Sequence, residues 1–159
     1  MTGRFIISAH RNLKVSPEEV WNLTSDTSRY ADWVSSVLEV TEHHEQARKG
    51  DTYIERVKSI GPLTTRAEWT VRTIEPMSLR IDSGEGFAPL TNVINVFRFA
   101  PIGDGNGTSM TYEFHFDLRP RQLGALVHKL LSKSMPAEFD ASMRRLELVI
   151  LSERSDDTN

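Results

Sequence analysis

Apolar residues follow a helical spacing over one long stretch of the chain, from Arg121 to Glu153. Residues three and four positions apart share one face of an α-helix, so this stripe predicts a helix with one buried and one solvated face. The stripe consists of Leu123, Leu126, Val127, Leu130, Leu131, Met135, Phe139, Met143, Leu146, Val149 and Ile150. A helix of this length is too long for one partner helix to bury, and we expect it to lie on a β-sheet. Because Pro136 removes a backbone donor inside the run, we expect a kink or a short break beside Met135.

The N-terminal part of the chain predicts a strand followed by two short helices. Apolar and polar residues alternate from Phe5 to Val15, which is the two-residue period of a β-strand. Ser16 and Glu19 then stand at the spacing of a capping box, with Pro17 at the first helical position. This signal predicts one short helix, and the polar residues that follow it predict the cap of a second, which carries Trp33.

Turn residues divide the stretch between Trp33 and Arg121 into strands. Glycine, proline, aspartate and asparagine recur there at spacings suited to an antiparallel meander. Six strands fit between them, at roughly 37–42, 51–59, 63–74, 79–83, 91–100 and 109–118. An antiparallel sheet with one apolar face twists and curls around what it buries. The chain therefore predicts an α+β domain over residues 1–153, in which a curved seven-stranded antiparallel sheet wraps the long C-terminal helix, and a flexible tail over residues 154–159.

One segment carries a family resemblance. The residues LKVSPEEVWNLTSDTSRYADWV at positions 13–34, together with Gly50-Asp51 before a strand and the amphipathic terminal helix, are similar to the START-related helix-grip superfamily. That superfamily includes polyketide cyclases, coenzyme Q-binding proteins, plant pathogenesis-related proteins and lipid-transfer domains. The resemblance covers nearly the whole chain and implies a cavity between sheet and terminal helix. It transfers no catalytic residue, because these markers belong to the fold.

The side chains expected to line this cavity are mostly aromatic. The predicted lining comprises Trp33, Ala67, Trp69, Phe87, Asn95, Phe97, Phe99, Tyr112, Phe114, Leu130, Met135 and Phe139. Each aromatic residue alone fits an ordinary core, since burial is the usual role of these side chains. Several of them facing a helix rich in leucine and methionine are typical of an apolar pocket. We place the access route where Phe87, in the glycine-containing segment 84–89, would face the helix at Pro136.

Four polar residues fall on the apolar side of the predicted strands: Arg11, Glu55, Asn95 and Tyr112. A buried polar group left without a hydrogen bond costs about 1 to 3 kcal/mol, so such groups are paired in folded proteins. Each of the four is therefore either part of a structural network or a group that orients a ligand. A β-bulge would reverse the register and place the residue outside.

Three residues of one strand, Glu113, His115 and Asp117, have the composition of a metal or acid–base site. They alternate with aromatic residues, however, so we expect them on the solvated face of the sheet. The adjacent His43 and His44 would point in opposite directions on a strand. We expect no metal and no other cofactor, and the nucleophile-elbow, dinucleotide and P-loop motifs do not occur.

Composition narrows the classes of function. A chain of 159 residues with 38% hydrophobic and 26% charged residues is typical of one globular domain. A net charge of −3 without a long basic cluster argues against a nucleic-acid partner. The absence of cysteine excludes disulfides, thiolate metal sites and a cysteine nucleophile. No apolar run is long enough for a signal peptide or a membrane span, and we expect a cytoplasmic monomer or weak homodimer.

Two kinds of function fit these features. The first is a binding protein that holds a small hydrophobic or aromatic, lipid- or polyketide-like molecule between sheet and terminal helix. The second, implied by the resemblance, is an enzyme of the polyketide cyclase, aromatase or dehydrase type, in which polar residues assist proton transfer in the same cavity. A regulatory protein that uses the groove for a protein segment has no support in the sequence.

Overall fold

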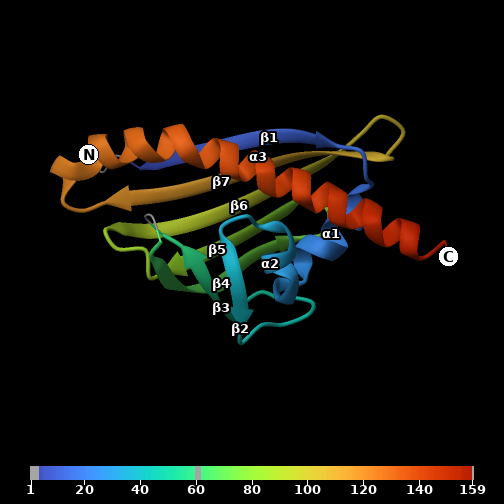
Figure 1. Cartoon of the computed structure of the whole chain (residues 1–159), viewed down its shortest axis with the longest axis horizontal. Helices are drawn as coiled ribbons and strands as arrows, with labels where there is room; N and C mark the ends of the chain where they lie inside the picture. The colour runs from blue at the N-terminus through green and yellow to red at the C-terminus, as the bar shows by residue number, and fades with distance from the viewer. Residues whose placement is uncertain (1–3, 60–61, 159) are drawn as a thin grey trace.

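The computed structural model of the chain describes residues 4–59 and 62–158 (Figure 1). The elements, in chain order, are β1 (Phe5–Leu13), α1 (Pro17–Ser25), the 3-10 turn η1 (Thr27–Arg29), α2 (Tyr30–Trp33), β2 (Val37–Thr41), β3 (Thr52–Lys58), β4 (Thr64–Glu75), β5 (Leu79–Glu85), β6 (Leu90–Ile102), β7 (Gly107–Leu118), the 3-10 turn η2 (Arg121–Leu123) and α3 (Gly124–Asp156). The predicted order of one strand, two short helices, six strands and one long helix is confirmed. The long helix ends three residues beyond the predicted limit of the domain.

The strands form one seven-stranded antiparallel sheet in the order β1-β7-β6-β5-β4-β3-β2. All neighbours from β2 to β7 are consecutive in the chain, as expected for a meander, and β1 closes the row by pairing with β7. Figure 1 shows α3 crossing the curved sheet on the side of β1 and β7, with α1 and α2 beside its C-terminal half. The predicted α+β helix-grip architecture is therefore correct.

The start of α1 has the predicted capping box. The backbone N–H of Glu19 donates to the Ser16 hydroxyl at 3.3 Å, and the backbone N–H of Ser16 donates to the Glu19 carboxylate at 2.9 Å. Two backbone donors that the helix itself cannot satisfy are thereby bonded. Glu19 also accepts from Arg154 near the end of α3 at 2.6 Å, which lowers the pKa of this carboxyl and links the two helices.

Of the kink or short break predicted at Pro136, the break does not occur. The described helix continues through this residue from Gly124 to Asp156. Proline has a φ that suits a helix and removes one backbone hydrogen bond, so the turns on either side can carry the helix past it.

In the described part of the chain, no helix is both long enough and apolar enough to cross a membrane.

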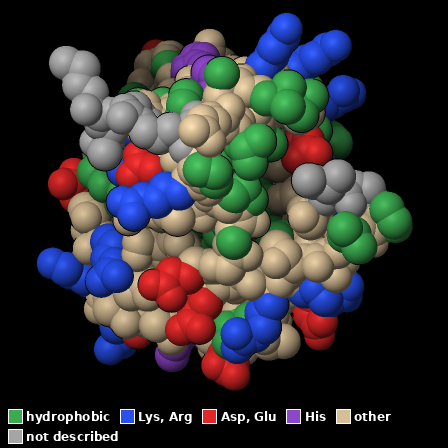
Figure 2. All heavy atoms as spheres, turned by 90° about the vertical axis from the view of Figure 1, so that its left-hand side faces the viewer, with side chains coloured by type: hydrophobic (Ala, Val, Ile, Leu, Met, Phe, Trp, Pro, Cys, Tyr) green, Lys and Arg blue, Asp and Glu red, His purple; other side chains and the backbone are tan. Residues whose placement is uncertain are grey.

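The predicted apolar stripe of α3 is buried in its second half and exposed in its first. Phe139, Met143, Leu146 and Ile150 are buried, whereas Leu123, Leu126 and Leu130 are about half exposed or more. The first half of α3 packs on the edge strand β1, where Phe5 contacts His128 at a ring distance of 4.6 Å, and it extends beyond α1 and α2. Figure 2 views the end of the molecule where α3 begins and shows hydrophobic side chains gathered there.

Candidate functional site

Aromatic side chains fill the space between the sheet and α3. Tyr112 of β7 stacks on Phe139 of α3 with ring centroids 4.1 Å apart, and Phe97 of β6 meets Tyr112 edge-on at 4.7 Å. Phe87, in the connection after β5, packs on Trp69 at 5.3 Å and on Phe114 at 6.1 Å. These contacts join β4, β6, β7 and α3 in one aromatic layer.

Most residues predicted to line a cavity lie in this interior. Eight of them are buried: Trp33, Ala67, Trp69, Phe97, Phe99, Tyr112, Phe114 and Phe139. Phe87 and Met135 are half-buried and pack against the same core, and Asn95 is half-buried on the inner face of β6. Leu130 is 61% exposed and lies outside the interior, because this part of α3 extends beyond α1 and α2.

Glu55 of β3 is a carboxyl group in this interior, with 5% of the residue exposed. The indole N–H of Trp69 donates to its Oε2 at 2.7 Å, and Ala67 stands opposite it on β4. Burial raises the pKa of Glu55 to about 8, because the charged form loses its water, and this effect outweighs the hydrogen bond from Trp69. Glu55 is therefore mainly a neutral carboxylic acid at pH 7.

Arg80 and Asp82 of β5 form a buried ion pair that the sequence patterns did not reveal. The two residues are 2% and 1% exposed, and Arg80 donates to both carboxylate oxygens of Asp82, at 2.7 and 3.0 Å. The hydroxyl of Tyr53 donates to Asp82 at 2.5 Å. Two charges and a phenol are thus satisfied together, as burial of charge requires.

The inward direction of this pair is fixed by Gly84, two residues further along β5. A Cβ atom at Gly84 would lie 2.6 Å from the ring of Trp69, so only glycine lets the indole lie over this position. Gly84 therefore faces inward and, by the two-residue period, so do Asp82 and Arg80. The sequence contained one signal for this inward direction. Arg80 and Asp82 alternate with Leu79 and Ile81 ahead of Gly84, in the strand at the centre of the sheet.

The interior also contains two tyrosines in addition to Tyr53. Tyr30 of α2 donates to the carbonyl of Thr24 at 3.0 Å and meets Tyr53 edge-on at 5.4 Å. Burial raises the pKa of Tyr30, Tyr53 and Tyr112, so all three are neutral phenols. We call Tyr30, Tyr53, Glu55, Arg80 and Asp82 the interior polar cluster.

Of five buried side-chain polar atoms without a hydrogen-bond partner in the described residues, two lie among the aromatic side chains of the interior. They are the indole Nε1 of Trp33 and the amide Oδ1 of Asn95, and both atoms are buried. Trp33 is in contact with Phe97 and Tyr30 at ring distances of 5.6 and 5.7 Å, so its N–H lies within the aromatic layer. Buried polar groups are nearly always paired in folded proteins, and such exceptions require an explanation.

The remaining predicted polar residues lie elsewhere. Arg11 forms an ion pair with Asp140 of α3 at 3.0 Å, which joins β1 to the helix. On the outer face, His115 pairs with Glu113 at 3.1 Å. Within residues 4–59 and 62–158, no three His, Asp or Glu side chains form a group that could hold a metal ion.

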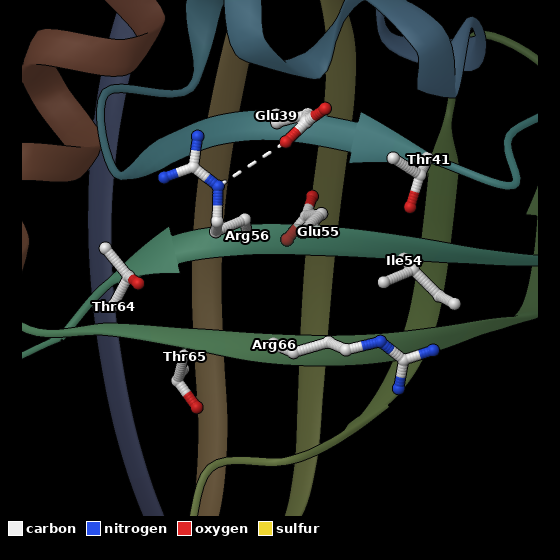
Figure 3. A pocket seen from close by; sticks show the side chains of 8 residues that line it. All are labelled: Glu39, Thr41, Ile54, Glu55, Arg56, Thr64, Thr65 and Arg66. Carbon is white, nitrogen blue, oxygen red and sulfur yellow. Dashed lines mark hydrogen bonds and ion pairs between the residues drawn. The ribbon is translucent and has the colours of Figure 1, made fainter.

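A shallow groove lies over β2, β3 and β4, with a volume of about 360 Å³ (Figure 3). Its lining comprises Glu39, Thr41, Ile54, Glu55, Arg56, Thr64, Thr65 and Arg66. Glu39 and Arg56 form an ion pair across it at 3.4 Å, and Figure 3 shows this pair between β2 and β3. Most of these side chains alternate with the inward-facing ones, so the groove is mainly a polar feature of the outer face.

Solved structures of several proteins share this fold. A START superfamily protein from Mycobacterium smegmatis is 16% identical with a TM-score of 0.72, covering 94% of this chain and 99% of that one. An aromatase/cyclase from Streptomyces sp. R1128 is 13% identical with a TM-score of 0.70, covering 99% and 97%. Norcoclaurine synthase from Thalictrum flavum, in complex with dopamine and hydroxybenzaldehyde, is 12% identical with a TM-score of 0.70, covering 95% and 88%. Identities this low show the fold alone.

No curated protein sequence matches the chain. A family profile described as polyketide cyclase / dehydrase and lipid transport matches residues 4–150, which is nearly the full length of the domain. The match includes β1 with the capping box, all seven strands and most of α3. The chain therefore belongs to the polyketide cyclase/dehydrase and lipid-transport family, and it has the START-related helix-grip fold.

Proposed function

We propose that the protein binds a small hydrophobic or aromatic molecule, lipid- or polyketide-like, between the inner face of the sheet and α3. The unpaired N–H of Trp33 and carbonyl oxygen of Asn95 in an aromatic interior support this proposal most directly. A ligand with one or two polar atoms would pair these groups and gain apolar contact with the surrounding rings. The described family is consistent with such a ligand.

The interior is filled by side chains, so the ligand has to displace some of them. The stacked pair of Tyr112 and Phe139 joins the sheet to α3, and its separation would open a space between them. The first half of α3 is the least covered part of the helix, with Leu126 and Leu130 exposed. We place the access route at this end, beside Phe87 and Pro136, where few buried contacts hold the helix.

An enzyme of the cyclase, aromatase or dehydrase type is the second candidate. One observation favours it, the neutral carboxyl of Glu55 with a pKa near 8 in an apolar site. A group of this kind can give or accept a proton near neutral pH. Two of the structural relatives named above are enzymes. One is an aromatase/cyclase, and the other is a norcoclaurine synthase in complex with dopamine and hydroxybenzaldehyde. A genomic neighbourhood that contains a polyketide synthase would favour this candidate.

Titration with an apolar fluorescent dye such as diphenylhexatriene tests the binding proposal. We expect saturable binding to the folded protein. Ala67→Trp fills the interior beside Glu55 and should abolish the signal, whereas Ala141→Trp, on the exposed face of the second half of α3, should leave it unchanged. Thermal unfolding of both variants checks that they are folded. Native mass spectrometry of gently purified protein would identify a copurified ligand, and non-saturable dye binding would contradict the proposal.

A further inference from the structure

Within the interior polar cluster, the carboxylate of Asp82 has several hydrogen-bond partners, whereas the carboxyl group of Glu55 has one. Asp82 accepts two hydrogen bonds from Arg80 and one from Tyr53, so its carboxylate is paired and well hydrogen-bonded. Glu55 accepts one hydrogen bond at Oε2, from Trp69. Between residues 4–59 and 62–158, no other hydrogen bond involves its carboxyl group, and no salt bridge does.

The electrostatic surroundings of Glu55 favour its neutral form. The groups around its carboxyl are Tyr53 from its own strand, the indole N–H of Trp69 from β4, and the ion pair of Arg80 and Asp82 from β5. Tyr30 of α2 and Tyr112 of β7 are close enough for a charge on Glu55 to act on them. Glu138 of α3 acts on Tyr112 from the helix side. Burial and the negative charge of Asp82 both raise the pKa of Glu55, against the opposing effect of the Trp69 hydrogen bond.

The interior contains unused hydrogen-bond donors and one unused acceptor, the carbonyl oxygen of Asn95. A neutral carboxyl group has one O–H donor, and that of Glu55 has no acceptor in the described chain. The indole N–H of Trp33 is also without a partner. The hydroxyl of Tyr112 makes no hydrogen bond within the described residues, whereas those of Tyr30 and Tyr53 already donate. The complementary ligand therefore presents acceptor oxygens and carries no negative charge.

We propose that Glu55 contacts the ligand and donates a hydrogen bond to a carbonyl oxygen of an uncharged aromatic ketone. This assignment rests on the proposed binding function and adds the chemical class of the ligand. A carboxylate ligand is disfavoured, because the guanidinium groups of Arg80 and Arg11 are already paired with Asp82 and Asp140. An aromatic hydrocarbon would fill the same space without using the donor.

Prodan, an uncharged naphthyl ketone whose emission responds to hydrogen bonding at its carbonyl, is a suitable probe, with diphenylhexatriene as the probe that has no acceptor. Both are titrated between about pH 6 and about pH 10, where neither is charged. We expect Prodan affinity to fall about tenfold per pH unit above the Glu55 pKa of about 8, because ionised Glu55 cannot donate. Diphenylhexatriene should show a much smaller change.

Three variants separate this role from a structural one. Glu55→Gln keeps an acceptor for Trp69 and an N–H donor for the ketone. It should therefore bind Prodan with an affinity that does not change with pH. Glu55→Leu should weaken Prodan about tenfold and leave diphenylhexatriene unchanged. Glu68→Gln, on the exposed face of the neighbouring strand, should behave as wild type with both probes.

The outcomes distinguish the two proposals. If both probes bind saturably and wild type and Glu55→Gln have the same pH profile for Prodan, Glu55 does not donate to the ligand and the assignment is wrong. The binding function would stand in that case. If neither probe binds wild type saturably, the binding function fails and the assignment fails with it. Equal weakening of both probes by Glu55→Leu would reduce Glu55 to a packing role and would also overturn the assignment.

Discussion

The raised pKa of Glu55 gives a quantitative prediction for the stability of the Glu55→Gln variant, and this prediction does not depend on a ligand. Burial raises the pKa of Glu55 from its ordinary value of 4.5 to about 8 in the folded protein. Between these values the folded state holds a proton that the unfolded state has released. The free energy of unfolding therefore falls as the pH rises, and the contribution is fully present below pH 4.5 and lost by about pH 8.

The magnitude follows from the size of the shift. Each pKa unit corresponds to about 1.4 kcal/mol, so the difference between 4.5 and about 8 corresponds to on the order of 4 to 5 kcal/mol. Glutamine has the same shape, does not titrate and can still accept from the Trp69 indole through its amide oxygen. The stability of Glu55→Gln relative to wild type should rise by this amount across the range and remain constant on either side.

Urea unfolding at closely spaced pH values from about 4 to about 9 measures this difference. Comparing the variant with wild type at each pH cancels the titration of the other groups. Glu68→Gln is the matched control, because Glu68 is exposed on the adjacent strand, and its difference from wild type should be small at every pH. A difference for Glu55→Gln that changes by less than about 0.5 kcal/mol over the range would refute a desolvated, neutral Glu55.

Three further predictions concern the frame of the site. Ser16→Ala should lower the unfolding free energy by about 0.5 to 2 kcal/mol and leave dye binding intact, since it removes only the helix cap; no change in urea unfolding would contradict the role of the cap. Arg80→Met should cost about 3 to 5 kcal/mol, because Asp82 is then buried without its cation, and adding Asp82→Leu should recover part of the loss; equal stability of single and double variants would exclude this reason. Hydrogen exchange should be faster at 84–89 and 133–137 than in neighbouring segments and slower with ligand bound, and uniformly slow exchange in the free protein would leave the access route without support.

The local elements of this protein were predictable from its sequence because their causes are local. The cap at Ser16 and Glu19 needs residues three positions apart, and the strands are marked by alternation between turn residues. The inward positions of Trp69, Phe97 and Tyr112 followed from the same alternation, because one face of each strand is apolar. The family resemblance rested on such local markers as well.

The tertiary structure decided which polar groups meet in the interior. Arg80 and Asp82 face inward because Gly84 has to lie beneath the ring of Trp69, a contact between different strands that alternation within β5 does not contain. Glu55 was placed on the inner face from the sequence, but its raised pKa comes from burial among residues of other elements. Leu126 and Leu130 continue the apolar stripe of α3 yet remain exposed, because the first half of the helix packs only on the edge of the sheet at β1, whereas α1 and α2 lie against the second half. Periodicity fixes which side chains share a face, whereas burial depends on what the rest of the chain places against that face.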